Sequence, residues 1–253
     1  FLEYYVAKLL SPMAIDRLPT SSSFQVDLLA SSNGIGPRVI EYADDGILME
    51  FLDGTSLNED DVHNANNFST LYNIAKQLKK LHSFQTSCQS PNMLWYSLEA
   101  MLKDSLEKNL RDEFHFQKST IVPLMPKSSL VCGHGDFKPS NIYITKEHDA
   151  ARFIDFELSG LNYRGFDIAK LFRTEGRRNV ENRRLFIDAY LEDSNDSELL
   201  QLESAAFDPL TWFEAAAFFD YAARKDDPRN AEHWRALYSA RITCYEAALT
   251  ERF

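Results

Sequence analysis

The chain has 253 residues, of which 44% are hydrophobic, and its 38 acidic and 27 basic side chains give a formal net charge of −11. This length allows one large domain or two lobes with a real core, and the acidic balance argues against nucleic acid or an anionic membrane as a partner. Three cysteines without disulfide or zinc-site spacing, and no apolar run near the ~18 residues of a membrane span, predict a cytoplasmic protein.

The first 54 residues predict a small lobe rich in β-structure. Residues 1–10 are aromatic and β-branched around Lys8, which indicates a strand, whereas two prolines over 11–23 indicate a loop. The Asp45-Gly46 pair is a hairpin signal between two apolar runs. The expected order is a strand over 1–10, a loop over 11–23, a helix over 24–34 and two strands over 37–52, with Asp53-Gly54-Thr55 breaking the pattern.

Residues 55–253 predict a larger and mostly helical lobe. Apolar side chains at positions 71, 74, 75, 78 and 81 fall on one face of a helix over 66–84. Strand patterns return only over 129–156. Further helices are expected over 97–114, 166–172, 183–191, 210–224 and 233–253. The fold class is therefore α+β, with the boundary between the lobes near residue 54.

Three polar side chains stand where buried strands are expected to end. Asp136 and Asn141 follow the run SLVC, and Asp155 follows ARFI. Side chains at strand ends face a cleft, and carboxylate and amide oxygens are ligands that suit Mg²⁺. Together with Lys8, which can reach a phosphate, they are the parts that phosphoryl transfer needs.

These residues lie in two motifs, VCGHGDFKPSNIYI (131–144) and FIDFELSGLNYRGFDIAKLF (153–172). The order His-x-Asp, an Asn five residues later and an Asp after the next strand is related to the protein-kinase set. HGDFKPSN and IDFE resemble the aminoglycoside-phosphotransferase and choline-kinase group, and LNYRGFDIAKLF is similar to choline and ethanolamine kinases. Shorter segments at 15–17, 34–37, 50–54 and 77–82 agree, so that the resemblance covers most of residues 4–172.

The resemblance implies a protein-kinase-like fold with a nucleotide-binding lobe over 1–54 and a helical lobe over 55–253 that carries the substrate site. It implies a role for each residue that matches the motifs. Asp136 would be the catalytic base or orienter of the acceptor hydroxyl, Asn141 and Asp155 would bind Mg²⁺, Lys8 would bind the ATP phosphates, and the hinge residues Glu50, Phe51 and Leu52 would contact adenine.

A cationic acceptor would need an acidic and aromatic site. By the resemblance, Glu157 helps to line it, and Tyr163, Trp212, Phe219 and Tyr221 are candidate walls, since aromatic faces bind quaternary ammonium groups. The alternative stays open that the helical face with Trp212 and Phe219 is simply core.

Other polar residues of the motifs are assigned structural roles. We expect His134 to hold the catalytic loop by hydrogen bonds, Asp167 to cap the following helix, and His82 to close a helix at its C-terminal dipole. A solvated helix face is expected to carry Lys170, Arg173, Arg177 and Arg178, and the acidic run 58–61 to be a helix start or a solvated turn.

The sequence departs from the kinase pattern in its N-terminal lobe. Only seven residues precede Lys8, where a phosphate-covering hairpin would lie, so the hairpin is expected to be truncated or disordered. No glutamate lies between Glu3 and Glu41 to pair with Lys8, which leaves Gln25 or Asp27 as substitutes.

The sequence therefore predicts an ATP- and Mg²⁺-dependent phosphotransferase for a small amino alcohol, with choline or ethanolamine as the best candidate. Two alternatives remain: a related kinase for thiamine, an aminoglycoside or another alcohol, and a kinase-like binding module with little catalysis. Oligomeric state cannot be predicted from these residues.

Overall fold

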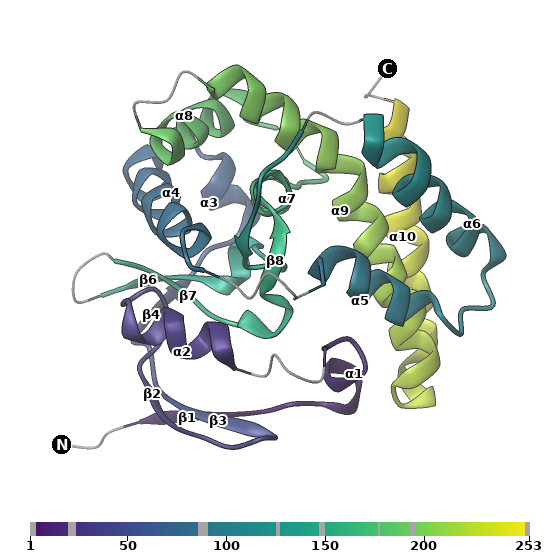
Figure 1. Cartoon of the computed structure of the whole chain (residues 1–253), viewed down its shortest axis with the longest axis horizontal. Helices are drawn as coiled ribbons and strands as arrows, with labels where there is room; N and C mark the ends of the chain where they lie inside the picture. Colours follow the sequence, from purple (N-terminus) through teal and green to yellow (C-terminus); the bar gives the residue numbers. More distant parts are fainter. Residues whose placement is uncertain are drawn as a thin grey trace.

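A computed structural model of the protein describes residues 4–19, 24–85, 91–124, 127–146, 150–176, 178–192 and 196–250. It has the predicted two-lobed α+β architecture, with a small sheet near the N-terminus and a larger helical part (Figure 1). Within the described ranges, no helix has both the length and the apolar character that a bilayer crossing requires.

The N-terminal sheet has the strand order β1-β3-β2 and is antiparallel throughout: β1 is Tyr5–Leu9, β2 is Val39–Tyr42 and β3 is Gly46–Glu50. Helix α2 (Gln25–Ser32) lies between this sheet and the rest of the molecule (Figure 1). Lys8 stands opposite Ile47, in the middle of the β1–β3 pairing.

One turn of helix, α1 (Pro12–Ile15), lies where the sequence predicted only loop. The Ser11 side chain accepts the N–H of Ala14, and Pro12 occupies the first turn, where its missing N–H costs nothing. The first of the two prolines that suggested a loop therefore begins a helix, and Pro19 lies after it.

The strands of the large lobe form two further antiparallel sheets. Strands β4 (Gly54–Ser56), β6 (Ile142–Thr145) and β7 (Ala151–Phe153) form one, and β5 (Leu130–Gly133) pairs with β8 (Gly160–Tyr163) in the other. The region 129–156 was expected to return to strands, but β4 and β8 were not predicted. Both are short and rich in glycine and polar residues, so neither shows an alternating pattern.

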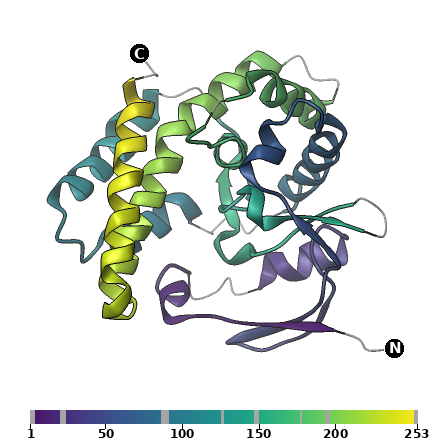
Figure 2. The same cartoon turned by 180° about the vertical axis from the view of Figure 1, so that it is seen from behind.

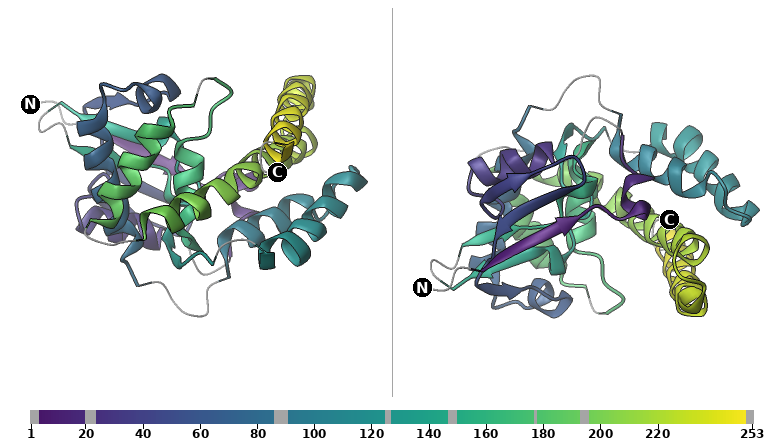
Figure 3. Two further views of the ribbon diagram at one scale, coloured as in Figure 1. Left: turned by 90° about the horizontal axis from the view of Figure 1, so that it is seen from above. Right: turned by 90° about the horizontal axis from the view of Figure 1, so that it is seen from below.

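The helices of the large lobe follow the predicted apolar runs with two differences: the single helix expected over 97–114 is divided by residues 103–107, and the helix expected over 210–224 begins at Ser197. They are α3 (Glu59–His63), α4 (Phe68–His82), α5 (Met93–Leu102), α6 (Lys108–Phe116), α7 (Arg164–Leu171), α8 (Val180–Leu191), α9 (Ser197–Lys225) and α10 (Ala231–Thr250). The acidic run does begin a helix, because Asn58 and Asp61 form a capping box at α3. Helices α9 and α10 lie side by side (Figure 2), away from the N-terminal sheet when the molecule is seen from below (Figure 3).

Helix α7 joins two hydrophobic clusters and is buried from Gly165 to Leu171. Ile168 and Leu171 pack with α4, α8 and the β6–β7 strands, whereas Phe166 and Ala169 pack with α5, α9 and α10. A polar side chain on either flank of α7 therefore lies inside the protein, which positions the site described next.

Candidate active site

The loop after β5 has a backbone that only glycine permits at its second position. Gly135 has a φ of +80°, and a Cβ there would lie 2.2 Å from the carbonyl oxygen of Leu158. His134 is fully buried, its Nδ1 accepts the N–H of Asp136 at 3.3 Å, and its Nε2 donates to the carbonyl of Ile154 at 3.0 Å. Burial lowers the pKa of His134, which favours the neutral ring. The expectation that His134 holds this loop is confirmed.

Asp136 lies among hydrogen-bond donors from three directions. The Asn141 amide donates to the Asp136 carbonyl at 2.9 Å and to its Oδ2 at 3.1 Å. Lys138 lies 2.7 Å from Oδ2, and Lys170 lies 2.9 Å from Oδ1. Burial alone would raise the pKa of Asp136, but the two ammonium groups outweigh it and hold the pKa well below the ordinary value.

The β6–β7 hairpin brings Asp155 beside Asn141, as the spacing of these residues predicted. Ile142 pairs with Phe153, and the N–H of Ile154 donates to the carbonyl of Asn141 at 3.0 Å. Asp155 itself has a φ of +69°, a left-handed conformation that costs a residue other than glycine about 1–3 kcal/mol. Backbone strain of this size is concentrated at functional positions, and here it turns Asp155 away from its strand.

Lys8 reaches across from the small lobe to the acids after β7. Its Nζ contacts Asp155 Oδ1 and lies 3.2 Å from Glu157 Oε2. Burial lowers the pKa of Lys8, but the two carboxylates outweigh that effect and the pKa is raised. Neither predicted substitute is its ion-pair partner: Gln25 is on the exposed side of α2, and Asp27 is buried near Lys8 without such a contact in the described structure.

A pocket of about 530 Å³ lies between the two lobes at this point. Six predicted residues line it: Lys8, Glu50, Phe51, Leu52, Asn141 and Asp155. The Glu50 carboxylate also accepts the N–H of Arg38 at 2.7 Å. The structure thus brings the residues predicted to bind nucleotide and metal to one cavity. Asp136 lies next to this cavity, where its carboxylate accepts a hydrogen bond from Asn141.

The predicted acceptor residues do not form one group. Glu157 faces cations, since Arg17 donates to it at 2.9 Å beside Lys8. Tyr163 accepts from the Trp95 indole at 3.1 Å and packs on Phe207. Trp212, Phe219 and Tyr221 lie on α9. The guanidinium groups of Arg173 and Arg241 lie 4.8 Å and 5.4 Å from the centre of the Trp212 ring. Arg241 also neighbours Phe219, which stacks on Trp234, and Tyr221 donates to Asp16.

One of the structural predictions was wrong. Asp167 does not cap α7; it is fully buried and accepts the N–H groups of His134 at 2.7 Å and Gly135 at 2.9 Å. His82 ends α4, as predicted, and its ring lies 3.0 Å from Asp167 Oδ2 and 2.8 Å from the Tyr190 hydroxyl. Asp167 therefore holds the loop at His134 and Gly135, and His82 contacts Asp167.

The expected solvated helix face was wrong for Lys170 and Arg173, but Arg178 is exposed as expected. Lys170 is 2% exposed, and Arg173 donates to the carbonyl of Thr211 besides covering Trp212. Arg178 lies near Asp208, and Arg177 lies outside the described residues.

Four charged residues near the site were missed from the sequence: Arg17, Lys138, Lys170 and Glu214. Lys138 and Lys170 stand within the quoted motifs and Arg17 within the matching segment 15–17, which was the available signal for them. Nothing in the sequence pointed to Glu214, which lies within an apolar stretch of α9.

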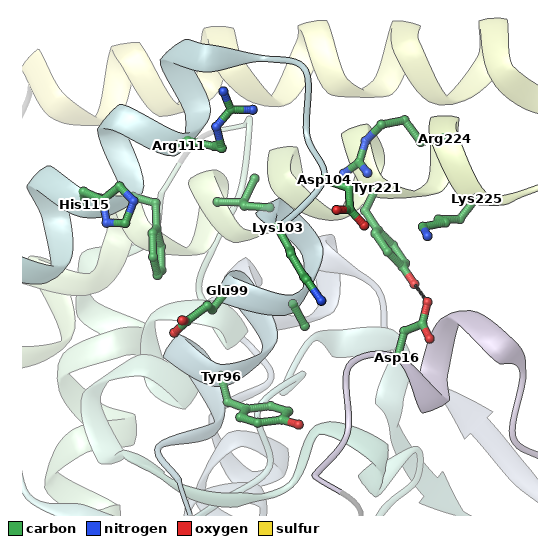
Figure 4. Close-up of a pocket in the computed structure, with 13 residues that line it drawn as sticks. Asp16, Tyr96, Glu99, Lys103, Asp104, Arg111, His115, Tyr221, Arg224 and Lys225 are labelled. Carbon is green, nitrogen blue, oxygen red and sulfur yellow. Dashed lines mark hydrogen bonds between the residues drawn. The ribbon is translucent and has the colours of Figure 1, made fainter.

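A second cavity, of about 750 Å³, lies between α5, α6, α9 and the end of α1, and none of the predicted site residues except Tyr221 lines it. Figure 4 shows the Tyr221 hydroxyl directed at Asp16, and this hydrogen bond of 2.8 Å ties the segment after β1 to α9. The cavity thus lies at a junction between the lobes rather than at Asp136.

Comparisons with known proteins agree with this architecture. Residues 15–219 match the family model of choline/ethanolamine kinases. A probable choline kinase of Arabidopsis thaliana is 28% identical over 155 residues, which are 56% of this chain and 43% of that protein, so the chain spans less than half of this relative's length.

Solved structures show the same fold. An ethanolamine kinase of Plasmodium vivax superimposes with a TM-score of 0.75 at 20% identity, covering 94% of this chain and 75% of that one. An ADP-bound aminoglycoside phosphotransferase gives a TM-score of 0.62 at 16% identity, covering 95% and 86%. The fold is therefore shared with both groups of small-molecule kinases, and the family match over most of the chain shows that this protein belongs to the choline/ethanolamine kinase family.

Proposed function

We propose that this protein transfers the γ-phosphoryl group of ATP, with Mg²⁺, to the hydroxyl of a small amino alcohol, choline or ethanolamine. One observation carries the proposal: Lys8, Asn141 and Asp155 converge from separate segments on one pocket, and Asp136 is hydrogen-bonded to Asn141 beside it. Folding alone does not require three such polar groups to meet there.

The pocket between the lobes is proposed to bind ATP. Its volume of about 530 Å³ is in the usual range for small-ligand sites. Glu50, Phe51 and Leu52 would contact adenine, and Lys8 would contact the phosphates. The proposed division of labour assigns residues 1–54 to the nucleotide lobe and residues 55–253 to the catalytic and acceptor lobe.

Asn141 and Asp155 are proposed to hold Mg²⁺. The Asn141 amide nitrogen is used by Asp136, which leaves its oxygen as a ligand atom next to the Asp155 carboxylate. Among the described residues, no group of three His, Cys, Asp or Glu side chains could hold a metal. Two oxygen ligands fit Mg²⁺, because this ion commonly takes the rest of its shell from substrate phosphates and water. When bound, the ion would neutralise phosphate charge.

Asp136 is proposed to orient the acceptor hydroxyl. In the transfer, the hydroxyl oxygen bonds to the γ-phosphorus, the bond to the β–γ bridging oxygen breaks, ADP leaves and the hydroxyl proton is released. The low pKa of Asp136 suits a hydrogen-bond acceptor more than a strong base. A loose phosphoryl-transfer transition state makes little demand on base strength, so positioning is the larger contribution.

The choice of choline or ethanolamine rests on the family, since the curated relative is named a probable choline kinase and the structural neighbour an ethanolamine kinase. Glu157, Tyr163, Trp212 and Phe219 remain the proposed acceptor residues. The Trp212 ring already attracts two guanidinium groups, which supports its use as a cation-binding face. A quaternary ammonium group would have to displace one of them.

The proposed setting is the cytoplasm, without nucleic acid or membrane as a partner. Cys132 and Cys244 are free thiols, as a reducing compartment favours. The net charge of −11 supports the expectation that polyanions are not bound.

The test is ADP release by the full-length protein with choline, ethanolamine, thiamine, an aminoglycoside or no acceptor, each with and without Mg²⁺. We expect magnesium-dependent release with choline or ethanolamine alone. Release with only another acceptor would keep the phosphotransfer and overturn the acceptor. Magnesium-dependent ATP binding with no release on any acceptor would overturn the function in favour of a binding module.

A further inference from the structure

A buried lysine links the catalytic loop to helix α9. The Lys170 ammonium lies 2.9 Å from Asp136 Oδ1 and donates to Glu214 Oε2 at 2.7 Å, with a longer contact of 3.4 Å to the Gly135 carbonyl. Lys170 is 2% exposed and Glu214 is 7% exposed. An ammonium group has three N–H donors, and each has an oxygen acceptor here, so the group is fixed in rotation as well as in place.

The arrangement fixes each oxygen of Asp136 separately. Oδ2 accepts a hydrogen bond from the Asn141 amide and pairs with the Lys138 ammonium, whereas Oδ1 pairs only with the Lys170 ammonium among the described contacts. A carboxylate oxygen can accept two hydrogen bonds, so Oδ1 keeps one position for a further donor. That position is next to the Lys170 ammonium.

The charges around Lys170 explain why Glu214 is needed. Asp136 faces Lys170 from the loop after β5 and Glu214 faces it from α9, while the nearby guanidinium of Arg173, just after the end of α7, adds a like charge. A lone ammonium in this interior would be strongly disfavoured by the loss of its hydration. Burial lowers the pKa of Lys170, but Asp136 and Glu214 outweigh that effect and raise it, so the residue stays charged.

We propose that Lys170 is a positioning residue for phosphoryl transfer: it fixes the Asp136 carboxylate so that Oδ1 faces the acceptor hydroxyl, and Glu214 holds Lys170 in that place. The proposal rests on the proposed function and deepens it, because it names Lys170 as the residue that orients Asp136. Neither residue touches the nucleotide pocket, so both act through Asp136.

The chain contains a matched control for this ion pair. Arg164, at the start of the same helix α7, donates to the fully buried Glu203 of α9 at 2.7 Å and 2.8 Å. Glu203 precedes Glu214 by eleven residues, or about 16 Å along the helix. Both pairs join α7 to α9, but only the pair of Lys170 reaches Asp136.

The experiment compares Lys170→Met, Lys170→Arg, Glu214→Gln and Glu203→Gln in the full-length protein, with kcat, both KM values and the melting temperature measured for each. We expect Lys170→Met to lower kcat by about 100-fold, as misplacement of a reacting group by 1 Å can, with the KM for ATP changed less than about threefold. Glu214→Gln should lower kcat about tenfold, Lys170→Arg should recover part of the loss, and Glu203→Gln should lower only the melting temperature.

A crystal structure of Lys170→Met supplies a readout that does not depend on the acceptor. We expect the Asp136 carboxylate to rotate so that Oδ1 leaves its present position, while Oδ2 stays with Asn141 and Lys138. The proposal is overturned if Asp136 keeps its orientation, if kcat of Lys170→Met stays within about threefold of wild type, or if Glu203→Gln lowers kcat as much as Glu214→Gln. If the wild-type protein turns over no acceptor, the proposed function fails, and the rotation of Asp136 alone decides the positioning role.

Discussion

The carboxylate of Asp167 accepts the backbone N–H of His134 at 2.7 Å, and so ties the catalytic loop to the first turns of α7. The same carboxylate accepts from Gly135 and contacts the His82 ring. Burial tends to raise the pKa of Asp167, but the hydrogen bond from His82 and the nearby imidazoles outweigh it, and the pKa is lowered. The carboxylate is therefore charged in the folded protein, and its two oxygen atoms link α7 to the loop after β5 and to the end of α4.

Replacement of Asp167 should destabilise the whole protein. Asp167→Ala leaves the N–H groups of His134 and Gly135 buried without their acceptor, which should lower the free energy of unfolding by roughly 3–5 kcal/mol. Urea unfolding of the variant measures this loss. A loss below about 0.5 kcal/mol, the range of an ordinary surface substitution, would show that the contact is not structural.

Replacement of Lys8 should weaken ATP binding. A charge-assisted contact to phosphate contributes about 1.5–3 kcal/mol, so Lys8→Met should raise the Kd for MgATP about 10- to 100-fold. Lys146 is the matched control, because it also pairs with an aspartate, Asp53, but both side chains are exposed. Equilibrium binding should show no change for Lys146→Met, and equal weakening in the two variants would remove Lys8 from the nucleotide site.

Asp27 should make stability fall as the pH rises. Burial raises its pKa from 3.8 to about 6, against the opposing effect of Lys8 and with a smaller contribution from Asp155 and Glu157. The folded state therefore binds this proton more tightly than the unfolded chain does. The resulting stability is fully present below pH 4 and is lost as the pH rises through 6, a change of about 2–3 kcal/mol.

The variant Asp27→Asn tests this sign. It should flatten the pH dependence of unfolding between pH 4 and 6 and should raise the melting temperature at pH 7.5 relative to wild type. A variant that is less stable than wild type at pH 7.5 would mean that attraction to Lys8 outweighs the burial of the charge.

Ser97 should be replaceable with a gain in stability. Its hydroxyl is buried on α5 and has no hydrogen-bond partner in the described structure. Ser97→Ala removes an unpaired polar group and adds helix propensity, so thermal unfolding should show a gain of about 1 kcal/mol. A loss of stability would indicate that the hydroxyl has a partner, such as a bound water.

The sequence predicted those parts of the site that depend on residues close together in the chain. It did not predict the contacts that depend on how distant segments pack. Asp136, Asn141 and Asp155 are fixed by strand ends and one hairpin, so their order along the chain was enough to bring them together. The ion-pair partner of Lys8 is Asp155, which lies 147 positions further along the chain, so no spacing within the small lobe could reveal it.

The errors at α7 have a common physical cause. Lys170 and Asp167 were assigned to exposed or capping roles because charged residues on short helices usually have them. Here α7 is covered on both flanks by separate hydrophobic clusters, so each charged residue had to find a buried partner. A helical pattern gives one apolar face, and it cannot show that a second face is also covered.

The most direct test is detection of the phosphorylated product by phosphorus NMR, with full-length protein, MgATP and either choline or ethanolamine, and with Asp136→Asn in parallel. We expect a new phosphomonoester signal with at least one of the two acceptors, its loss when Mg²⁺ is chelated, and no detectable signal from the variant, which should melt close to wild type. Absence of the ester with both acceptors, or its formation by Asp136→Asn at nearly the wild-type rate, would contradict the assignment of Asp136 as the centre of phosphoryl transfer.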